Sequence, residues 1–323
     1  MKIGSVAYIL LSLGLAAGPI GALLEGQDAK TQSGSRNLGD LSLEELGNVQ
    51  IYSASRHMQS EGEAPSSVTV ITRDEIQKYG YRTLADILRS VRGLDITYDR
   101  SYTYAGVRGI NLPDVYNSRI LLLIDGHRIN NNIYEQAMLG TEFPMDLDLI
   151  ERVEIVRGPS SSLYGASAFF AVINVITRLP DDLNGTELSF VPASFGTYNG
   201  RASYGRQFKG IGVMLSGDFL NSQGQTLFYP EFNSPTTNNG IVYNADYDRY
   251  QHFLAKIMWR GFNLEGVYGG RIKGIPTASY GTVFGDPRSS TFDSQRHLDL
   301  GYQRTLGKGW DLAVRTSVAR EPL

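Results

Sequence analysis

The side chains that most often carry out chemistry are sparse in this sequence. There is no cysteine, which excludes disulfides, thiolate metal ligands and cysteine nucleophiles. Neither a G-x-S-x-G nor an H-E-x-x-H motif is present, and Asp146 and Asp148, near a helical turn, are interpreted as solvated caps. None of the four histidines has a metal-ligand spacing; they are His57, His127, His252 and His297. The sequence therefore predicts no catalytic residue, no metal site, no cofactor and no enzyme activity.

Charged residues instead border an unusually apolar segment. Arg152 and Arg157 lie in an alternating stretch, IERVEIVRGP (150–159), which is soon followed by FFAVINVIT (169–177). A sheet with one apolar face and one charged face would produce this pattern. We expect such a sheet in a domain that another part of the structure encloses.

The overall charge and the first residues restrict the partners and the compartment. The 30 basic and 33 acidic residues form no basic stripe, so we expect no nucleic-acid partner. Lys2 and the apolar run VAYILLSLGLAAG, with small residues through Ala22, predict a signal peptide over residues 1–22. Residues 23–47 are polar and predict a flexible periplasmic arm.

Residues 48–180 predict a compact α+β domain with a mixed sheet and short helices. Thr72 and Glu75 fit a capping box at the start of a short helix. Asp125 and Gly126 form the dipeptide that favours a two-residue hairpin turn between strands. These local signals are typical of a domain with its own core.

Residues 181–323 change to long two-residue alternations without helix signals. In HFLAKIMWR (252–260), Phe253, Ile257 and Trp259 share one face, and Lys256 lies on the opposite face. Strands of this kind are apolar outward and polar inward in outer-membrane barrels. The strands of a soluble β-sandwich also alternate between apolar and polar residues. The connections between the strands must therefore distinguish a barrel from a sandwich.

The connections alternate between short and long. Tight turns are expected at 209–210, near 261 and at 307–308, whereas 221–247 and 273–292 are long and polar. This asymmetry favours antiparallel transmembrane β-barrel strands over a sandwich. The seven expected strands lie near 185–193, 197–208, 211–220, 248–260, 262–272, 293–306 and 309–320. An open sheet edge is untenable in hydrocarbon, so we expect an incomplete barrel, from either a fragment of a longer chain or a truncated reading frame.

Six motifs in this order resemble the TonB-dependent outer-membrane transporters. They are DLSLEELGNVQIYSASR, APSSVTVITRDEI, LADILRSVRGLDI, VRGI, ILLLIDGHRI and IERVEIVRGPSSSLYGASAFFAVINVIT, over about residues 40–180. The resemblance implies a plug domain inside a barrel in the cell outer membrane, with the plug and the N-terminal arm facing the periplasm. Past residue 180 the resemblance is one of pattern only.

The resemblance also implies a function and its partners. It implies active uptake of a scarce ligand, a metal chelate such as a ferric siderophore, driven by TonB and its inner-membrane energising complex. Outer-membrane lipid would contact the apolar faces of the strands. The alternative function is a ligand-binding or signalling module with a truncated barrel that does not transport.

In this family, arginines in motifs that match VRGI and VRGP pair with glutamates of the barrel wall and lock the plug. Carried over, these are Arg108 and Arg157, whose partners would lie in strands that this chain lacks. The alternative is that both arginines pair within the plug.

A further implied site is the TonB box, a strand that pairs edge-on with TonB. The segment NVQIYSAS (48–55) alternates and could be extended without a fixed partner, or could be the first strand of the plug sheet. The implied TonB-box residues are Val49, Gln50, Ile51, Tyr52 and Ser53.

Ligand contacts are implied in the plug loops at 100–106, 111–117 and 130–143. Tyrosines in such loops are equally compatible with ordinary packing. The candidate ligand-binding residues are Tyr102, Tyr104, Tyr116, Tyr134 and Glu135.

Overall fold

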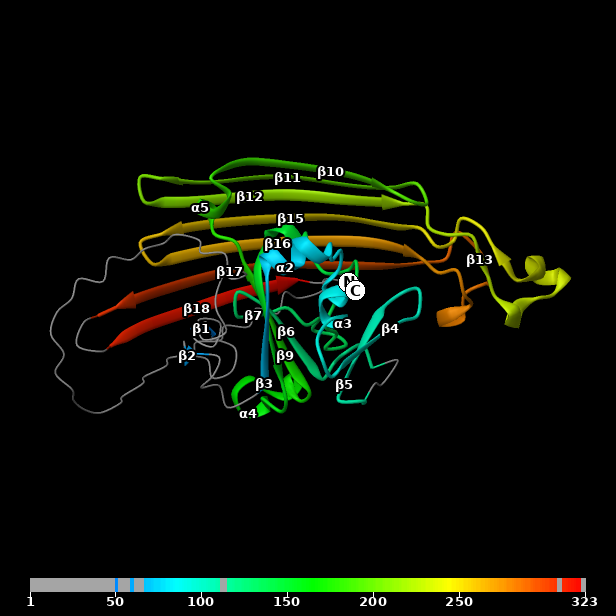
Figure 1. Ribbon diagram of the computed structural model, residues 1–323, viewed down its shortest axis with the longest axis horizontal. Helices are drawn as coiled ribbons and strands as arrows, with labels where there is room; N and C mark the ends of the chain where they lie inside the picture. The colour runs from blue at the N-terminus through cyan, green and yellow to red at the C-terminus, as the bar shows by residue number, and fades with distance from the viewer. Residues whose placement is uncertain (1–49, 52–58, 61–66, 111–114, 307–309, 321–323) are drawn as a thin grey trace, which may run out of the picture.

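The structure is a computed structural model, and its elements form two parts that pack against each other. A mixed α/β unit, here called the plug, spans residues 67–183, and a sheet of long strands, here called the wall, spans residues 185–320. The plug lies against one face of the wall (Figure 1). The signal peptide and arm predicted for residues 1–47 lie outside the described residues, which are 50–51, 59–60, 67–110, 115–306 and 310–320.

The plug is built on a mixed sheet, as predicted. In the described part of the plug this sheet has the spatial order β3 (Ser67–Thr72), β8 (Ile150–Arg157), β9 (Ala171–Thr177), β6 (Ile120–Ile124) and β7 (His127–Arg128). Only β6 and β9 of these neighbours run parallel. The apolar FFAVINVIT segment supplies β9, which lies in the middle of the sheet and is buried on both faces, and this explains its composition. A separate hairpin joins β4 (Leu94–Tyr98) and β5 (Thr103–Val107).

Short helices cover the sheet. The predicted capping box at Thr72 is present: the Glu75 amide donates to Thr72 Oγ1 at 3.3 Å, and the Thr72 amide donates to Glu75 Oε2 at 2.8 Å. The next helix packs Leu84, Ile87 and Leu88 into the core with no exposed surface. The α-helices are α2 (Arg73–Tyr79), α3 (Leu84–Arg89), α4 (Ser161–Tyr164) and α5 (Pro180–Leu183). None of the described helices is long and apolar enough to cross a membrane.

The wall contains, among the described residues, the seven strands that were predicted. Every neighbouring pair is antiparallel and follows chain order, so the sheet is a meander with β10 and β18 at its open edges. The strands are β10 (Gly185–Ala193), β11 (Thr197–Phe208), β12 (Ile211–Ser222), β15 (Asp248–Trp259), β16 (Phe262–Gly274), β17 (Ser290–Thr305) and β18 (Asp311–Arg320).

The long connections of the wall project from one end of the sheet (Figure 1). One of them carries a small hairpin of β13 (Leu227–Phe228) and β14 (Ile241–Val242). Phe284 of the second connection stacks on Phe232 of the first, with ring centroids 4.0 Å apart. The 3-10 helices are η3 (Leu147–Leu149), η4 (Ala166–Ala168), η5 (Pro230–Phe232), η6 (Pro235–Gly240) and η7 (Ser279–Gly281).

The two faces of the wall differ as the alternation predicted, with one correction. Phe253 is 47% exposed on the outward face, and its neighbour in the strand, Leu254, is 1% exposed on the inward face. The inward face is therefore not uniformly polar: Met214, Leu254 and Val267 join the apolar core of the plug. The plug is held by hydrophobic contact with the wall as well as by polar contacts.

We expect the middle of the outward face to lie in hydrocarbon. Phe253→Arg, in the middle of β15, should destabilise the wall by about 2–4 kcal/mol in lipid, because charge is most costly at the bilayer midplane. Gln251→Arg, on the same exposed face but nearer the strand end, should cost at most about 1 kcal/mol. Folding titrations of both variants in lipid vesicles measure the difference, and equal costs would contradict the lipid-facing assignment.

Candidate functional site: the interface between plug and wall

Charged side chains concentrate where the plug meets the wall. In the described residues, wall cations reach plug carboxylates at three places along this interface: Arg271 at Glu142, Lys256 at Asp125, and Arg201 at Asp146 and Asp148. At these three places the wall contributes the cation and the plug contributes the carboxylates. At two others the plug contributes the cation: Arg178 Nη2 lies 2.8 Å from Glu187 Oε1 of the wall, and Arg100 Nη1 lies 3.6 Å from Asp246 Oδ2. A plug arginine paired with a wall glutamate is therefore present, but at Arg178 and not at Arg108 or Arg157.

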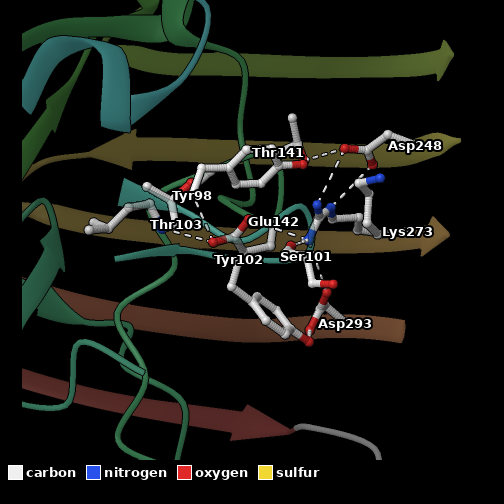
Figure 2. Close-up of polar contacts among 12 residues, drawn as sticks. Tyr98, Ser101, Tyr102, Thr103, Thr141, Glu142, Asp248, Lys273 and Asp293 are labelled. Atoms are coloured by element: carbon white, nitrogen blue, oxygen red, sulfur yellow. Dashed lines mark hydrogen bonds and ion pairs between the residues drawn. The ribbon is translucent and has the colours of Figure 1, made fainter. Parts of the chain in front are cut away.

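Arg271 of β16 is the centre of the first cluster. Its carboxylate partners Glu142, Asp248 and Asp293 are labelled in Figure 2. Its side chain is 2% exposed, and its Nη1 lies 3.5 Å from Glu142 Oε2 of the plug. Two wall carboxylates also contact the guanidinium, with Nε 3.1 Å from Asp248 Oδ1 and Nη1 3.4 Å from Asp293 Oδ2. Nη1 also donates to the backbone carbonyl of Ser101 at 3.0 Å. A buried guanidinium can be stable here because it has several acceptors.

The two wall carboxylates of this cluster also bind the plug directly. The Tyr102 hydroxyl donates to Asp293 Oδ1 at 2.8 Å, and the Thr141 hydroxyl donates to Asp248 Oδ2 at 2.6 Å (Figure 2). The cluster therefore joins the β4–β5 hairpin and the 130–143 loop of the plug to three neighbouring strands of the wall.

Glu142 is held by its own loop before it meets Arg271. The amides of Leu139 and Gly140 donate to Glu142 Oε1 at 3.1 and 3.0 Å. A Cβ at position 140 would lie 2.6 Å from Glu142 Oε2, so glycine leaves the room that this carboxylate needs. Burial raises the pKa of the Glu142 carboxyl above its usual value, and Arg271 opposes that shift.

Lys256 of β15 is the centre of the second cluster. Its Nζ donates to Asp125 Oδ2 of the plug at 2.6 Å, lies 3.2 Å from Glu265 Oε2 of the wall, and contacts the Thr177 hydroxyl. The predicted hairpin turn positions Asp125: Asp125 and Gly126 both have positive φ, of 46° and 75°. Burial acts to raise the pKa of the Asp125 carboxyl, but the attraction of Lys256 outweighs it and lowers that pKa.

Arg201 of β11 is the centre of the third cluster. Its Nη2 lies 3.0 Å from Asp148 Oδ2, its Nε lies 3.5 Å from Asp146 Oδ1, and its Nη1 lies 3.2 Å from Glu187 Oε2 of the wall. Asp146 does cap η3, as predicted, but neither aspartate is simply solvated, because both pair with Arg201. Burial, together with repulsion from Asp218, raises the pKa of Asp146 to about 6.

The described histidines pack at the same interface. The rings of His127 in the plug and His297 in the wall are 5.1 Å apart, and His252 Nδ1 lies 2.9 Å from Asp218 Oδ2. No group of three or more potential ligands that could hold a metal ion is assembled in the part of the chain that the structure describes.

Comparison with known proteins identifies this two-part architecture. Residues 60–172 match the family model described as the TonB-dependent Receptor Plug Domain. The vitamin B12 transporter BtuB of Vibrio vulnificus is 32% identical over 186 residues, which cover 56% of this chain and 29% of that protein. Residues 60–172 are a plug domain of the TonB-dependent receptor type, and the findings together support a TonB-dependent receptor.

Solved structures of TonB-dependent receptors share the fold. The siderophore receptor PiuA of Acinetobacter baumannii superposes with a TM-score of 0.61 at 16% identity, covering 87% of this chain and 40% of that chain. The ferric yersiniabactin uptake receptor FyuA of Yersinia pestis gives 0.56 at 18% identity, covering 78% and 40%. The chain thus spans less than half the length of these relatives.

The structure places the two arginines of the predicted plug lock differently from each other. Arg157 lies within the plug, where it donates to Ser67 Oγ at 2.8 Å, to Thr69 Oγ1 at 3.1 Å and to the carbonyl of Arg92. Arg108 is exposed in a turn with φ of 55°, just past the end of β5. Neither arginine forms an ion pair with a described residue.

The predicted TonB box lies only partly within the described residues. Val49, Tyr52 and Ser53 lie outside them. Gln50 and Ile51 form β1 (Gln50–Ile51), which pairs antiparallel with β2 (Gln59–Ser60). These two residues thus pair in a two-stranded sheet that is separate from the main plug sheet, and the TonB box stays a prediction.

The candidate ligand-binding residues separate into buried and accessible groups. Tyr102 and Tyr104 are 9% and 4% exposed, and their hydroxyls donate to Asp293 and Asp99. Tyr134 is 59% exposed, and its ring lies 5.3 Å from that of the half-buried Tyr116. Glu135 contacts Arg128, and it lines a cavity of about 550 Å³ with Ser118, Arg119, Arg128, Tyr164, Ala166, Ser167 and Phe169.

The contacts that join plug and wall were not predicted from the sequence, although a signal for some of the residues was present. Lys256 and Arg271 lie on the polar side of alternating strands, which indicates an inward direction. Asp125 was recognised only as a turn residue. Their pairing spans 131 residues between Asp125 and Lys256, so the alternation indicates a direction but no partner.

Removal of Arg271 should loosen the plug from the wall. Arg271→Met leaves Glu142, Asp248 and Asp293 buried without their cation, which typically costs about 3–5 kcal/mol. Hydrogen exchange of the plug amides in outer-membrane vesicles, followed by mass spectrometry, measures the loosening. Arg206→Met, at an exposed arginine of β11, is the matched control and should leave exchange unchanged. Equal exchange in both variants would contradict this role of Arg271.

Proposed function

We propose that this receptor takes up a metal chelate across the outer membrane by an energy-dependent movement of the plug. The observation that carries the proposal is the interface itself, in which a plug with its own apolar core is tied to the inward face of an outward-apolar wall. A ligand crossing along that face must displace at least part of the plug. Energy from outside the receptor is then needed, because the ion pairs and the apolar contacts must be broken.

The proposed ligand class rests on the relatives. The relative BtuB is named for vitamin B12, a cobalt chelate. The solved structures PiuA and FyuA are named for siderophores, which chelate iron. The proposed cargo is therefore a bulky metal chelate, with a ferric siderophore as the preferred member of that class. The accessible groups at the plug loops, Tyr116, Tyr134 and Glu135, offer aromatic and anionic contacts to such a ligand.

The proposed location is the cell outer membrane, with the long wall connections outside the cell. The exposed apolar face would contact lipid, and the plug and β1 would face the periplasm. In this arrangement TonB pairs with the segment around β1, and its inner-membrane complex supplies the energy. Arg108, which is exposed and has no ion pair with a described residue, is the better of the two arginines to lock the plug against wall residues outside these strands.

Uptake by cells tests the ligand class. Cells that depend on this protein for uptake should accumulate ferric yersiniabactin or vitamin B12, and collapse of the proton gradient across the inner membrane should abolish accumulation. Binding to the cell surface should persist in the de-energised cells. Accumulation that is independent of the gradient would contradict energy-dependent transport.

A proline in β1 tests the TonB box. Strand addition gains affinity mainly from backbone hydrogen bonds, and proline removes an amide hydrogen and fixes φ. Ile51→Pro should therefore stop uptake without changing surface binding of the same chelate. Ile51→Ala keeps the amide and is the matched control, for which we expect at most a mild loss of uptake. A proline variant that kept uptake, or that lost binding as well, would contradict this assignment.

A further inference from the structure

Each wall cation at the interface has a carboxylate partner within the wall as well as one on the plug. For Lys256 the wall partner is Glu265, whose side chain is 1% exposed. Arg271 has Asp248 and Asp293 as wall partners, whereas Glu187, which contacts Arg201, lies closer to Arg178 of the plug. At Lys256 and Arg271 the wall is therefore compensated in charge without the plug.

Three of the four plug carboxylates, Asp125, Glu142 and Asp146, likewise have hydrogen-bond donors within the plug. Asp125 accepts from the Thr177 amide at 3.0 Å and from the Thr177 hydroxyl at 2.6 Å. Glu142 accepts from the two loop amides described above, and Asp146 accepts from the Asp148 amide at 2.9 Å. These bonds remain when the plug leaves the wall.

This arrangement changes what it costs to separate the two parts. A buried charge left without a partner costs several kcal/mol, so simple one-to-one pairs across the interface would resist separation strongly. Here Lys256 keeps Glu265 and Asp125 keeps Thr177 after separation. The interface combines specific docking with a reduced penalty for opening.

We propose that Glu265 is a release residue: a wall carboxylate that holds Lys256 when the plug moves away, so that the ion pair with the plug opens and re-forms. It is a positioning residue that acts through Lys256. The inference rests on the proposed function, in which uptake requires the plug to move. Its test measures opening of the interface without any uptake.

Because Asp125 and Glu265 compete for Lys256, neutralising one or the other should change the opening of the interface in opposite directions. Asp125 and Glu265 both lie within 3.2 Å of its Nζ, from opposite sides of the interface. Neutralising Asp125 removes the plug partner and should favour opening. Neutralising Glu265 leaves Asp125 as the only one of these two carboxylates that can pair with Lys256. It also removes the repulsion between the two carboxylates, so opening of the interface should be disfavoured. A merely structural role predicts instead that both changes loosen the interface.

A single thiol can report the opening, because the chain contains no cysteine. Val267 of the wall is 4% exposed, packs against the plug core, and shares its strand face with Glu265. In Val267→Cys protein in outer-membrane vesicles, without chelate or TonB, the rate of maleimide labelling measures opening. We expect Glu265→Gln to slow labelling roughly tenfold and Asp125→Asn to speed it roughly tenfold, each equivalent to about 1.4 kcal/mol. Glu231→Gln, at an exposed carboxylate in a long connection, is the control and should leave the rate unchanged.

Further variants keep the test decisive. In a Lys256→Met background, Glu265→Gln should no longer slow labelling, because no cation remains to be shared. If Glu265→Gln does not assemble, Glu265→Asp, whose shorter side chain draws the carboxylate away from Lys256, takes its place, and slower labelling is again expected. Unchanged or faster labelling of the release-residue variant would overturn the inference. If the labelling rates follow the expected order but cells do not take up the chelate, the proposed function alone would be contradicted.

Discussion

The ion pairing of wall cations with plug carboxylates is the constraint on which the rest of this structure depends. Lys256, Arg201 and Arg271 are nearly completely buried, so each must be matched by acceptors on elements that arrive from both sides. The plug supplies these acceptors from turns and caps: the β6–β7 hairpin, the 130–143 loop and the start of η3. Local backbone geometry in the plug therefore decides where the wall can dock.

The same constraint explains why the wall strands are patterned as they are. Their outward positions have to tolerate an apolar environment, and their inward positions have to match a folded domain instead of water alone. Leu254 and Lys256 are neighbours on the inward face, one in the apolar core of the plug and the other in an ion pair. The strands thus carry two side-chain patterns: the outward side chains suit lipid, and the inward side chains match the plug.

Sequence reasoning predicted the features that depend on residues close in the chain. The capping box of Thr72 and Glu75, the Asp125-Gly126 turn and the seven wall strands are all set by local patterns, and the structure confirms them. Contacts that join distant residues could not be predicted in this way. Lys256→Ala appears mild from alternation alone, because an inward lysine resembles a solvated one, yet its side chain is 3% exposed and paired. Tyr102 likewise resembles a ligand contact until the wall residue Asp293 is placed against its hydroxyl.

A double-mutant cycle between Lys256 and Asp125 tests most directly whether ion pairs hold the plug to the wall. The free energy of interface opening is measured for Lys256→Met, for Asp125→Asn and for the double variant, each by labelling of the thiol in Val267→Cys protein. The account predicts a coupling free energy of about 1.5–3 kcal/mol, because the two charged groups are in direct contact at 2.6 Å. Additivity of the two single effects to within about 0.5 kcal/mol would contradict it.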